Sequence, residues 1–217
     1  DQIGMIADKL STQTGKKITN DFKPIKKNEG FKTSSQVQYV ARSGNFIRSG
    51  FKYTGALKVL RTILNYDYLW INLRVKGGAY GCMSGFSYTG NAYLVSYRDP
   101  HLKETNHIYE KTEEYVKNFN ADERDMTKYI IGTISGIDTP LTPSGKGTYS
   151  LSAYLSEITM EDLQKERKEI LSARIEDIQE LSGVVKSIID DGNICVIGNE
   201  QKIEENKELF MEVKNLM

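Results

Sequence analysis

The spacing of apolar side chains along the chain predicts strands in its first half. Residues 35–41 alternate, with Val37, Tyr39 and Ala41 between Gln36, Gln38 and Val40, as in a half-buried strand. A second extended piece is expected at 45–49. Two further strands are predicted at 80–88 and 91–97, joined by a Thr-Gly-Asn turn at 89–91 that suits a positive φ.

The helical pattern has a different period and dominates the second half. Leu57, Leu60, Ile63 and Leu64 recur at intervals of three and four, which predicts an amphipathic helix that ends before residue 74, with Trp70 and the neighbouring tyrosines in the core. The elements expected after residue 100 are helices at 102–119, 120–137, 159–171, 176–190 and 201–210, and a strand at 194–197 covered on both faces. This order predicts an α+β fold, a mainly antiparallel sheet with helices packed on one face.

The chain divides into a leading segment and one domain. Ile3, Ile6 and Leu10 lie at helical spacing, so residues 1–10 are interpreted as the end of a helix that belongs to a preceding domain. Residues 11–33 are polar and are expected to form a connecting segment. We therefore predict residues 1–34 as a leading helix end and linker, and 35–217 as a single α+β domain.

The composition of the chain argues against nucleic acid and membrane as partners. Lys and Arg number 29, as do Asp and Glu, so there is no basic face for nucleic acid. No apolar run is long enough to span a bilayer, and the first 20 residues lack a signal-peptide core. Two cysteines, Cys82 and Cys195, do not form a disulfide framework, which favours a reducing compartment. We expect a cytoplasmic protein with neither nucleic acid nor membrane as a partner.

The segment 74–81, Arg-Val-Lys-Gly-Gly-Ala-Tyr-Gly, holds the candidate chemistry. If Gly77 and Gly78 adopt positive φ and turn the chain back, Arg74 and Tyr80 point into one cleft. An arginine donates hydrogen bonds to carbonyl or carboxylate oxygens, and a phenol can donate to an oxygen that gains charge in a transition state. The alternative interpretation is a glycine-rich hairpin with a surface arginine and a packed tyrosine.

This segment lies between Tyr-Asp-Tyr-Leu-Trp at 66–70 and Ser-Tyr-Arg-Asp-Pro at 96–100, and in this setting it resembles the C-terminal half of the pitrilysin/insulinase superfamily of zinc metallopeptidases. The presequence protease and falcilysin branch is the most similar, over about 36–210. The resemblance implies a repeated α+β domain, with zinc in an N-terminal half that this domain closes over. It also implies that Arg74 holds substrate backbone, that Tyr80 stabilises the oxyanion, and that Gly77, Gly78 and Ala79 complete the substrate-binding segment.

Metal and phosphate motifs are incomplete in this chain. His101 and Glu104 reproduce H-x-x-E, but Thr105 replaces the second histidine, and His107 lies off the required helical face. His101 is instead expected in the exposed first turn of a helix that Asp99 and Pro100 begin. We therefore predict no metal in this chain. The Pro-rich loop 138–147 lacks the glycine and hydroxyl positions of a phosphate loop and is expected to be a rigid connector.

The leading hypothesis is a non-zinc-binding, substrate-clamping domain of a zinc endopeptidase that degrades unstructured peptides in a closed chamber. Its partners would be the zinc-binding N-terminal half and peptide substrates, and this chain alone would be inactive. The alternative is a non-catalytic peptide-binding or scaffolding subunit with the same fold. An independent hydrolase is poorly supported, because there is no Gly-x-Ser-x-Gly elbow and Cys82 has no evident paired base.

Overall fold

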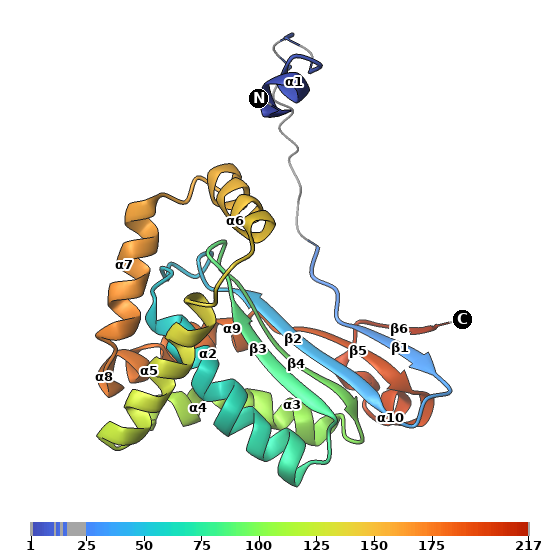
Figure 1. Ribbon diagram of the computed structural model, residues 1–217. Coiled ribbons are helices and arrows are strands. Elements are labelled where there is room, and N and C mark those ends of the chain that lie inside the picture. The colour runs from blue at the N-terminus through green and yellow to red at the C-terminus, as the bar shows by residue number, and fades with distance from the viewer. Residues whose placement is uncertain (1, 11, 14, 17–24, 217) are drawn as a thin grey trace.

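One mixed sheet organises the computed structural model, which describes residues 2–10, 12, 13, 15, 16 and 25–216. The strand order within the described residues is β3-β4-β2-β5-β1-β6 (Figure 1). The strands are β1 Glu29–Thr33, β2 Gln38–Asn45, β3 Gly81–Phe86, β4 Asn91–Asp99, β5 Asn193–Asn199 and β6 Glu212–Asn215. The pairs from β3 to β5 are antiparallel, whereas β1 runs parallel to both β5 and β6. The predicted α+β class with a mainly antiparallel sheet is confirmed.

Most helices lie to the left of the strands or below them in the view of Figure 1. The α-helices are α1 Gln2–Ala7, α2 Ala56–Ile63, α3 Lys103–Glu110, α4 Thr112–Lys117, α5 Glu123–Ile137, α6 Pro143–Leu155, α7 Met160–Leu171, α8 Ile175–Glu180, α9 Ser182–Asp190 and α10 Glu200–Glu205. Two π-helical segments, η1 Leu64–Tyr68 and η2 Trp70–Lys76, continue α2, and a 3-10 turn, η3 Lys207–Leu209, follows α10.

The two faces of the sheet differ. Helices α3, α9 and α10 cover the face that carries Val40 and Val196, and both of these side chains are buried. Gly44 is needed there, because a Cβ on it would lie 2.7 Å from the Cα of Ile188 in α9. On the opposite face, most strand residues that alternate with this set are half-buried or exposed; the buried ones there include Gly81 and Gly85. The sheet therefore has one covered and one open face, and the core lies on the covered side.

The phase of β2 corrects the sequence interpretation. Gln38 and Arg42 face the core with Val40, whereas Tyr39 is 44% exposed. Arg42 can be buried because Nη1 donates to Asn106 Oδ1 and Glu110 Oε1, each at 3.0 Å, and Nη2 donates to a carbonyl of α9. Internal hydrogen bonds thus place polar side chains where alternation alone predicts apolar ones.

Several predicted elements are confirmed. The hairpin of β3 and β4 turns at Gly90, whose φ is +83°. Thr159 and Asp162 form the predicted capping box of α7, in which each side chain bonds the other residue's backbone N–H. The helix predicted at 176–190 ends where expected, and Gly192, with φ +62°, follows its end. Within this range the structure has two helices, α8 and α9.

Other predicted boundaries are wrong. Residues 46–50 form a turn rather than a strand, and the helix predicted at 102–119 is two helices. Helix α5 is capped by Asp122, not Asn120, and the expected rigid connector 138–147 already contains the first turn of α6, capped by Thr142. Strand β1 lies in the segment predicted as a connector, and β6 follows the predicted terminal helix 201–210, where no element was expected. Part of that connector, at 11, 14 and 17–24, lies outside the described residues.

Candidate functional site

Arg74 lies on the last turn of a long helical segment. The sequence interpretation ended this helix before residue 74, but α2 continues through η1 and η2 to Lys76. Leu64, Leu69 and Leu73 are buried along it, and the interval of five between the first two suits the wider π-helical turn. The same widening leaves Trp70 44% exposed, so the expectation that it lies in the core is wrong.

The glycine pair ends this helix, and its two members do so for different reasons. Gly78 has φ +77°, the left-handed conformation that terminates many helices, and its N–H donates to Arg74 O at 3.2 Å. Gly77 keeps a helical φ of −85°, but a Cβ there would lie 2.7 Å from Leu73 O. Positive φ is therefore confirmed for Gly78 and not for Gly77. The chain reverses, and Ala79 N donates back to Leu73 O at 2.9 Å.

This reversal brings Arg74 and Tyr80 together. The guanidinium carbon of Arg74 lies 5.1 Å from the centre of the Tyr80 ring and 5.8 Å from that of Trp70. Arg74 Nη1 also donates to the carbonyl of Ala79 at 3.0 Å, which fixes the side chain against the turn. The alternative interpretation of a surface arginine beside a packed tyrosine fails for Tyr80, which is 55% exposed.

A second arginine, which the sequence did not single out, joins the pair. The guanidinium carbon of Arg98, at the end of β4, lies 5.4 Å from the centre of the Tyr80 ring. Arg98 has φ +48°, a conformation uncommon outside glycine, and its carbonyl accepts a hydrogen bond from Tyr80 N at 3.2 Å. Tyr97 meets Tyr80 edge to face, with ring centres 5.7 Å apart.

The electrostatics of this cluster favour an oxygen ligand. Asp99 is buried, and its carboxylate accepts from His101 N at 2.9 Å and Thr105 Oγ1 at 2.7 Å, so it is occupied internally. Within the described residues, the Tyr80 hydroxyl makes no hydrogen bond and Arg98 makes no ion pair. Tyr80 and Arg98 are exposed and Arg74 is half-buried beside them, an arrangement that can bind a carbonyl or carboxylate oxygen.

The neighbouring cysteine does not suit nucleophilic chemistry. Burial raises the pKa of the Cys82 thiol to about 11, an effect that Asp99 reinforces and Arg74 opposes. A thiol with this pKa is almost wholly protonated at neutral pH.

The histidines are not arranged as metal ligands. Helix α3 begins at Lys103 and not at Asp99 or Pro100 as expected, so His101 lies before it. The Nδ1 atom of His101 is 3.7 Å from Oε2 of Glu104. In the described part of the chain, no three His, Cys, Asp or Glu side chains are grouped to hold a metal ion. No described helix combines the length and apolar composition that a bilayer span requires.

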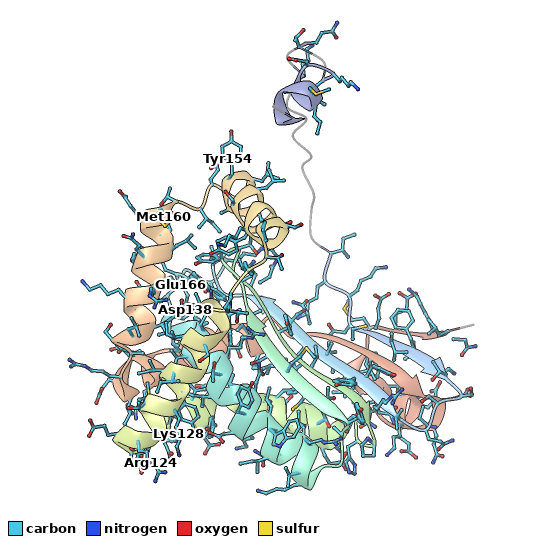
Figure 2. All side chains as sticks on the ribbon, viewed as in Figure 1. Arg124, Lys128, Asp138, Tyr154, Met160 and Glu166 are labelled. Carbon is cyan, nitrogen blue, oxygen red and sulfur yellow. The ribbon has the colours of Figure 1, made fainter. Side chains whose placement is uncertain are left out.

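A cavity of about 390 Å³ lies elsewhere, between α5, α6 and α7. Its lining includes Ile137, Tyr149 and Leu163, and none of the segment 74–80. Glu166 lies beside it, on the side of α7 that faces the domain (Figure 2). Its carboxylate accepts from Tyr53, Tyr88 and Lys58, so it ties α7 to the domain.

The tyrosines beside the site carry a sequence signal that the interpretation missed. In the antiparallel register, Gly81 lies opposite Tyr97 and Gly85 opposite Tyr93. The two glycines and the two tyrosines are each four residues apart, so both pairs lie on one face of the hairpin. Matched glycine and tyrosine spacing on two adjacent strands indicates rings that lie across glycine.

Comparisons with known proteins agree with one another. The family model described as PreP C-terminal domain matches residues 28–200. Protein HypA of Clostridium perfringens (strain 13 / Type A) is 47% identical over 217 residues, which is 100% of this chain and 22% of HypA. Presequence protease 1, chloroplastic/mitochondrial, of Arabidopsis thaliana is 32% identical over 208 residues, covering 94% of this chain and 19% of that protein. The chain spans about a fifth of the length of these curated relatives.

Solved structures show the fold. A protease from Helicobacter pylori superposes with a TM-score of 0.62 at 16% identity, over 88% of this chain and 49% of that chain. The peptidase M16 inactive domain from Pseudomonas fluorescens gives a TM-score of 0.59 at 12% identity, over 84% and 46%. At these identities the likeness concerns architecture.

Proposed function

Because this chain belongs to the PreP C-terminal domain family, we propose that it is the substrate-clamping domain of a zinc metalloendopeptidase that degrades unstructured peptides. Its relatives include presequence proteases, and its fold is shared with peptidase M16 domains. The zinc-binding N-terminal half is the proposed partner, closing with this domain into a chamber. Of the predicted leading segment 1–34, the part that precedes β1 is proposed to link the two. A cytoplasmic location stays a prediction from the sequence.

The observation that carries this proposal is the contact between half-buried Arg74 and exposed Tyr80. Gly78 reverses the chain, so that a guanidinium and a phenol six residues apart lie against each other. The hydrogen bond from Arg74 Nη1 to Ala79 O leaves other donors of the guanidinium for a substrate carbonyl. The pair is therefore preorganised to bind backbone oxygens.

The proposed roles of zinc, Arg74 and Tyr80 follow from the chemistry of each group. Zinc in the N-terminal half would supply Lewis-acid chemistry, and the described residues of this chain do not fit a zinc site. Arg74 would hold the peptide backbone in register. The Tyr80 hydroxyl would donate to the carbonyl oxygen as it gains negative charge, an interaction that is stronger in the transition state than in the ground state.

Substitution in the full-length, zinc-loaded protein tests these roles. Removal of one oxyanion donor costs about 10²–10³ in turnover, so Tyr80→Phe should lower kcat by that factor with KM little changed. Tyr66→Phe is the matched control, because Tyr66 is 73% exposed and lies on η1. Arg74→Ala should raise KM, and Arg74→Lys should not restore it, since an ammonium lacks the planar fork. Wild-type turnover in Tyr80→Phe would refute the assigned role.

The second candidate function is a non-catalytic peptide-binding or scaffolding subunit. One structural neighbour is a peptidase M16 inactive domain, and an inactive domain fits both this function and the clamping domain. An H-x-x-E-H segment in the N-terminal part of the full-length protein, or on an associated subunit, separates the two. Its presence supports the clamping domain, and its absence from both supports the scaffold.

A further inference from the structure

We propose that the open face of the hairpin β3–β4 is a subsite for one aromatic or large apolar side chain of the peptide, about four residues from the cleaved bond. Tyr93 is the residue that would contact this side chain. This inference rests on the proposed function, since it takes Tyr80 as the point where cleavage occurs.

The first observation is that two tyrosine rings lie flat across glycine. A Cβ on Gly81 would lie 2.4 Å from the Tyr97 ring, and one on Gly85 would lie 2.6 Å from the Tyr93 ring. Any larger residue would push these rings off the strand. The glycines therefore seat both rings against β3, and the rings present their other sides outward.

The second observation is that this face is open and uncharged. Met83 and Tyr93 are 41% and 40% exposed, and Val95 between the two tyrosines is only half-buried. The strand segments 81–86 and 91–97 contain no Asp, Glu, Lys or Arg. An exposed apolar patch of this kind binds apolar groups, so the face suits an uncharged side chain rather than a nucleic acid or an ion.

The third observation is continuity with the candidate site, which identifies the occupant as the peptide. The Tyr97 ring contacts the Tyr80 ring, and Tyr97, Val95 and Tyr93 share a face because side chains alternate along a strand. Tyr93 lies four residues beyond Tyr97, about 13 Å at about 3.3 Å per residue. An extended peptide held at Tyr80 rises by the same amount per residue. Its side chain about four residues from the cleaved bond therefore reaches Tyr93.

A positional scan in the full-length, zinc-loaded protein tests this subsite. The probes are alanine–serine peptides that carry one tryptophan at successive positions, from five residues before to five after a fixed cleavage site. The wild-type protein should show kcat/KM raised about 2- to 10-fold, relative to the same alanine–serine peptide without tryptophan, at one position about four residues from the bond. Tyr93→Ser should bring this ratio to about 1 and leave cleavage of the tryptophan-free peptide unchanged. Gly85→Ala should also reduce the ratio, because the added Cβ displaces the ring.

Tyr154→Ser is the matched control, because Tyr154 is 78% exposed on α6 and lies at its outer end (Figure 2). It should leave every ratio unchanged. The corresponding ratio of dissociation constants is measured by fluorescence anisotropy with the same peptides, with and without Tyr93→Ser, in the Tyr80→Phe protein. This gives the effect on binding separately from turnover. Failure of the proposed function would appear as wild-type cleavage by Tyr80→Phe, whereas failure of the subsite would appear as a ratio insensitive to Tyr93→Ser. If another part of the longer protein covers this face, Tyr93→Ser lowers the unfolding midpoint with no change in any ratio, which overturns the proposal.

Discussion

Replacement of Gly78 by alanine isolates the turn that joins Arg74 to Tyr80. Within the part of the chain that the structure describes, an added Cβ would meet Pro100 Cγ alone, at 3.6 Å, which is an ordinary contact. The cost therefore comes from the backbone, since φ is +77° and an L side chain disfavours this region by about 1–2 kcal/mol. Gly78→Asn should cost less than Gly78→Ala, because asparagine tolerates the left-handed region.

Gly77→Ala provides the contrast, because its φ of −85° is ordinary and the obstacle is steric. Its Cβ would lie 2.7 Å and 2.9 Å from the carbonyl oxygens of Leu73 and Asn72, which are backbone atoms. We expect a loss of about 1–3 kcal/mol, as for other overpacked positions. For Gly77, asparagine should be no better than alanine.

Urea unfolding of the four variants, with wild-type protein measured in parallel, gives these free energies. The asparagine variant should be more stable than the alanine variant at position 78 and no more stable at position 77. Equal stability of Gly78→Ala and wild type would refute the conclusion that a left-handed residue ends the helix. So would an asparagine advantage at both positions.

Two further predictions concern parts of the domain away from the site. Glu166→Gln should lower the free energy of unfolding by about 2 kcal/mol, because a buried carboxylate that accepts hydrogen bonds from Lys58 and two phenols loses its charge. The control is Glu161→Gln at an exposed position, and a smaller loss for Glu166→Gln than for this control would contradict the prediction. Burial raises the pKa of Tyr68 and of Tyr115, which stack at 4.4 Å, to about 12. A folded-state pKa above the unfolded value near 10 means that their contribution is complete below pH 10 and is lost as the pH rises towards 12. Urea midpoints between pH 9 and pH 12 should fall less steeply for Tyr115→Phe than for wild type, and parallel curves would count against this.

The sequence was sufficient where local chemistry decides the structure. The capping residues Thr159 and Asp162, Gly90 in the hairpin turn and the helical spacing of Leu57 and Leu60 depend on neighbours within a few residues, and each lies where predicted. The conjunction of Arg74 and Tyr80 was likewise predictable, because a glycine pair between them allows the chain to reverse.

The features that were predicted wrongly depend on contacts between side chains, and the spacing of residues along the sequence does not show these contacts. The π-helical turns that carry Arg74 are stabilised by packing of Leu64, Leu69 and Leu73, so periods of three and four ended the helix too early. The core position of Arg42 depends on partners 64 and 68 residues away.

Strands β1 and β6, neighbours at one side of the sheet, were missed for a related reason. Strand β1 reads Glu-Gly-Phe-Lys-Thr and is polar, but its parallel partners β5 and β6 are distant in sequence and supply its hydrogen bonds. Arg98 was missed because only the folded hairpin brings it to Tyr80, whereas the paired glycines and tyrosines were visible in the sequence.

A double-mutant cycle in the full-length, zinc-loaded protein tests the central claim most directly. It compares kcat/KM for wild type, Arg74→Ala, Tyr80→Phe and the double variant on one unstructured peptide. Because Arg74 is proposed to hold the same peptide whose carbonyl oxygen the Tyr80 hydroxyl stabilises, we expect a Tyr80→Phe loss of about 10²–10³ and a double variant less impaired than the product of the single losses. Wild-type activity of Tyr80→Phe, or single losses that multiply without coupling, would contradict the account of a joint clamp.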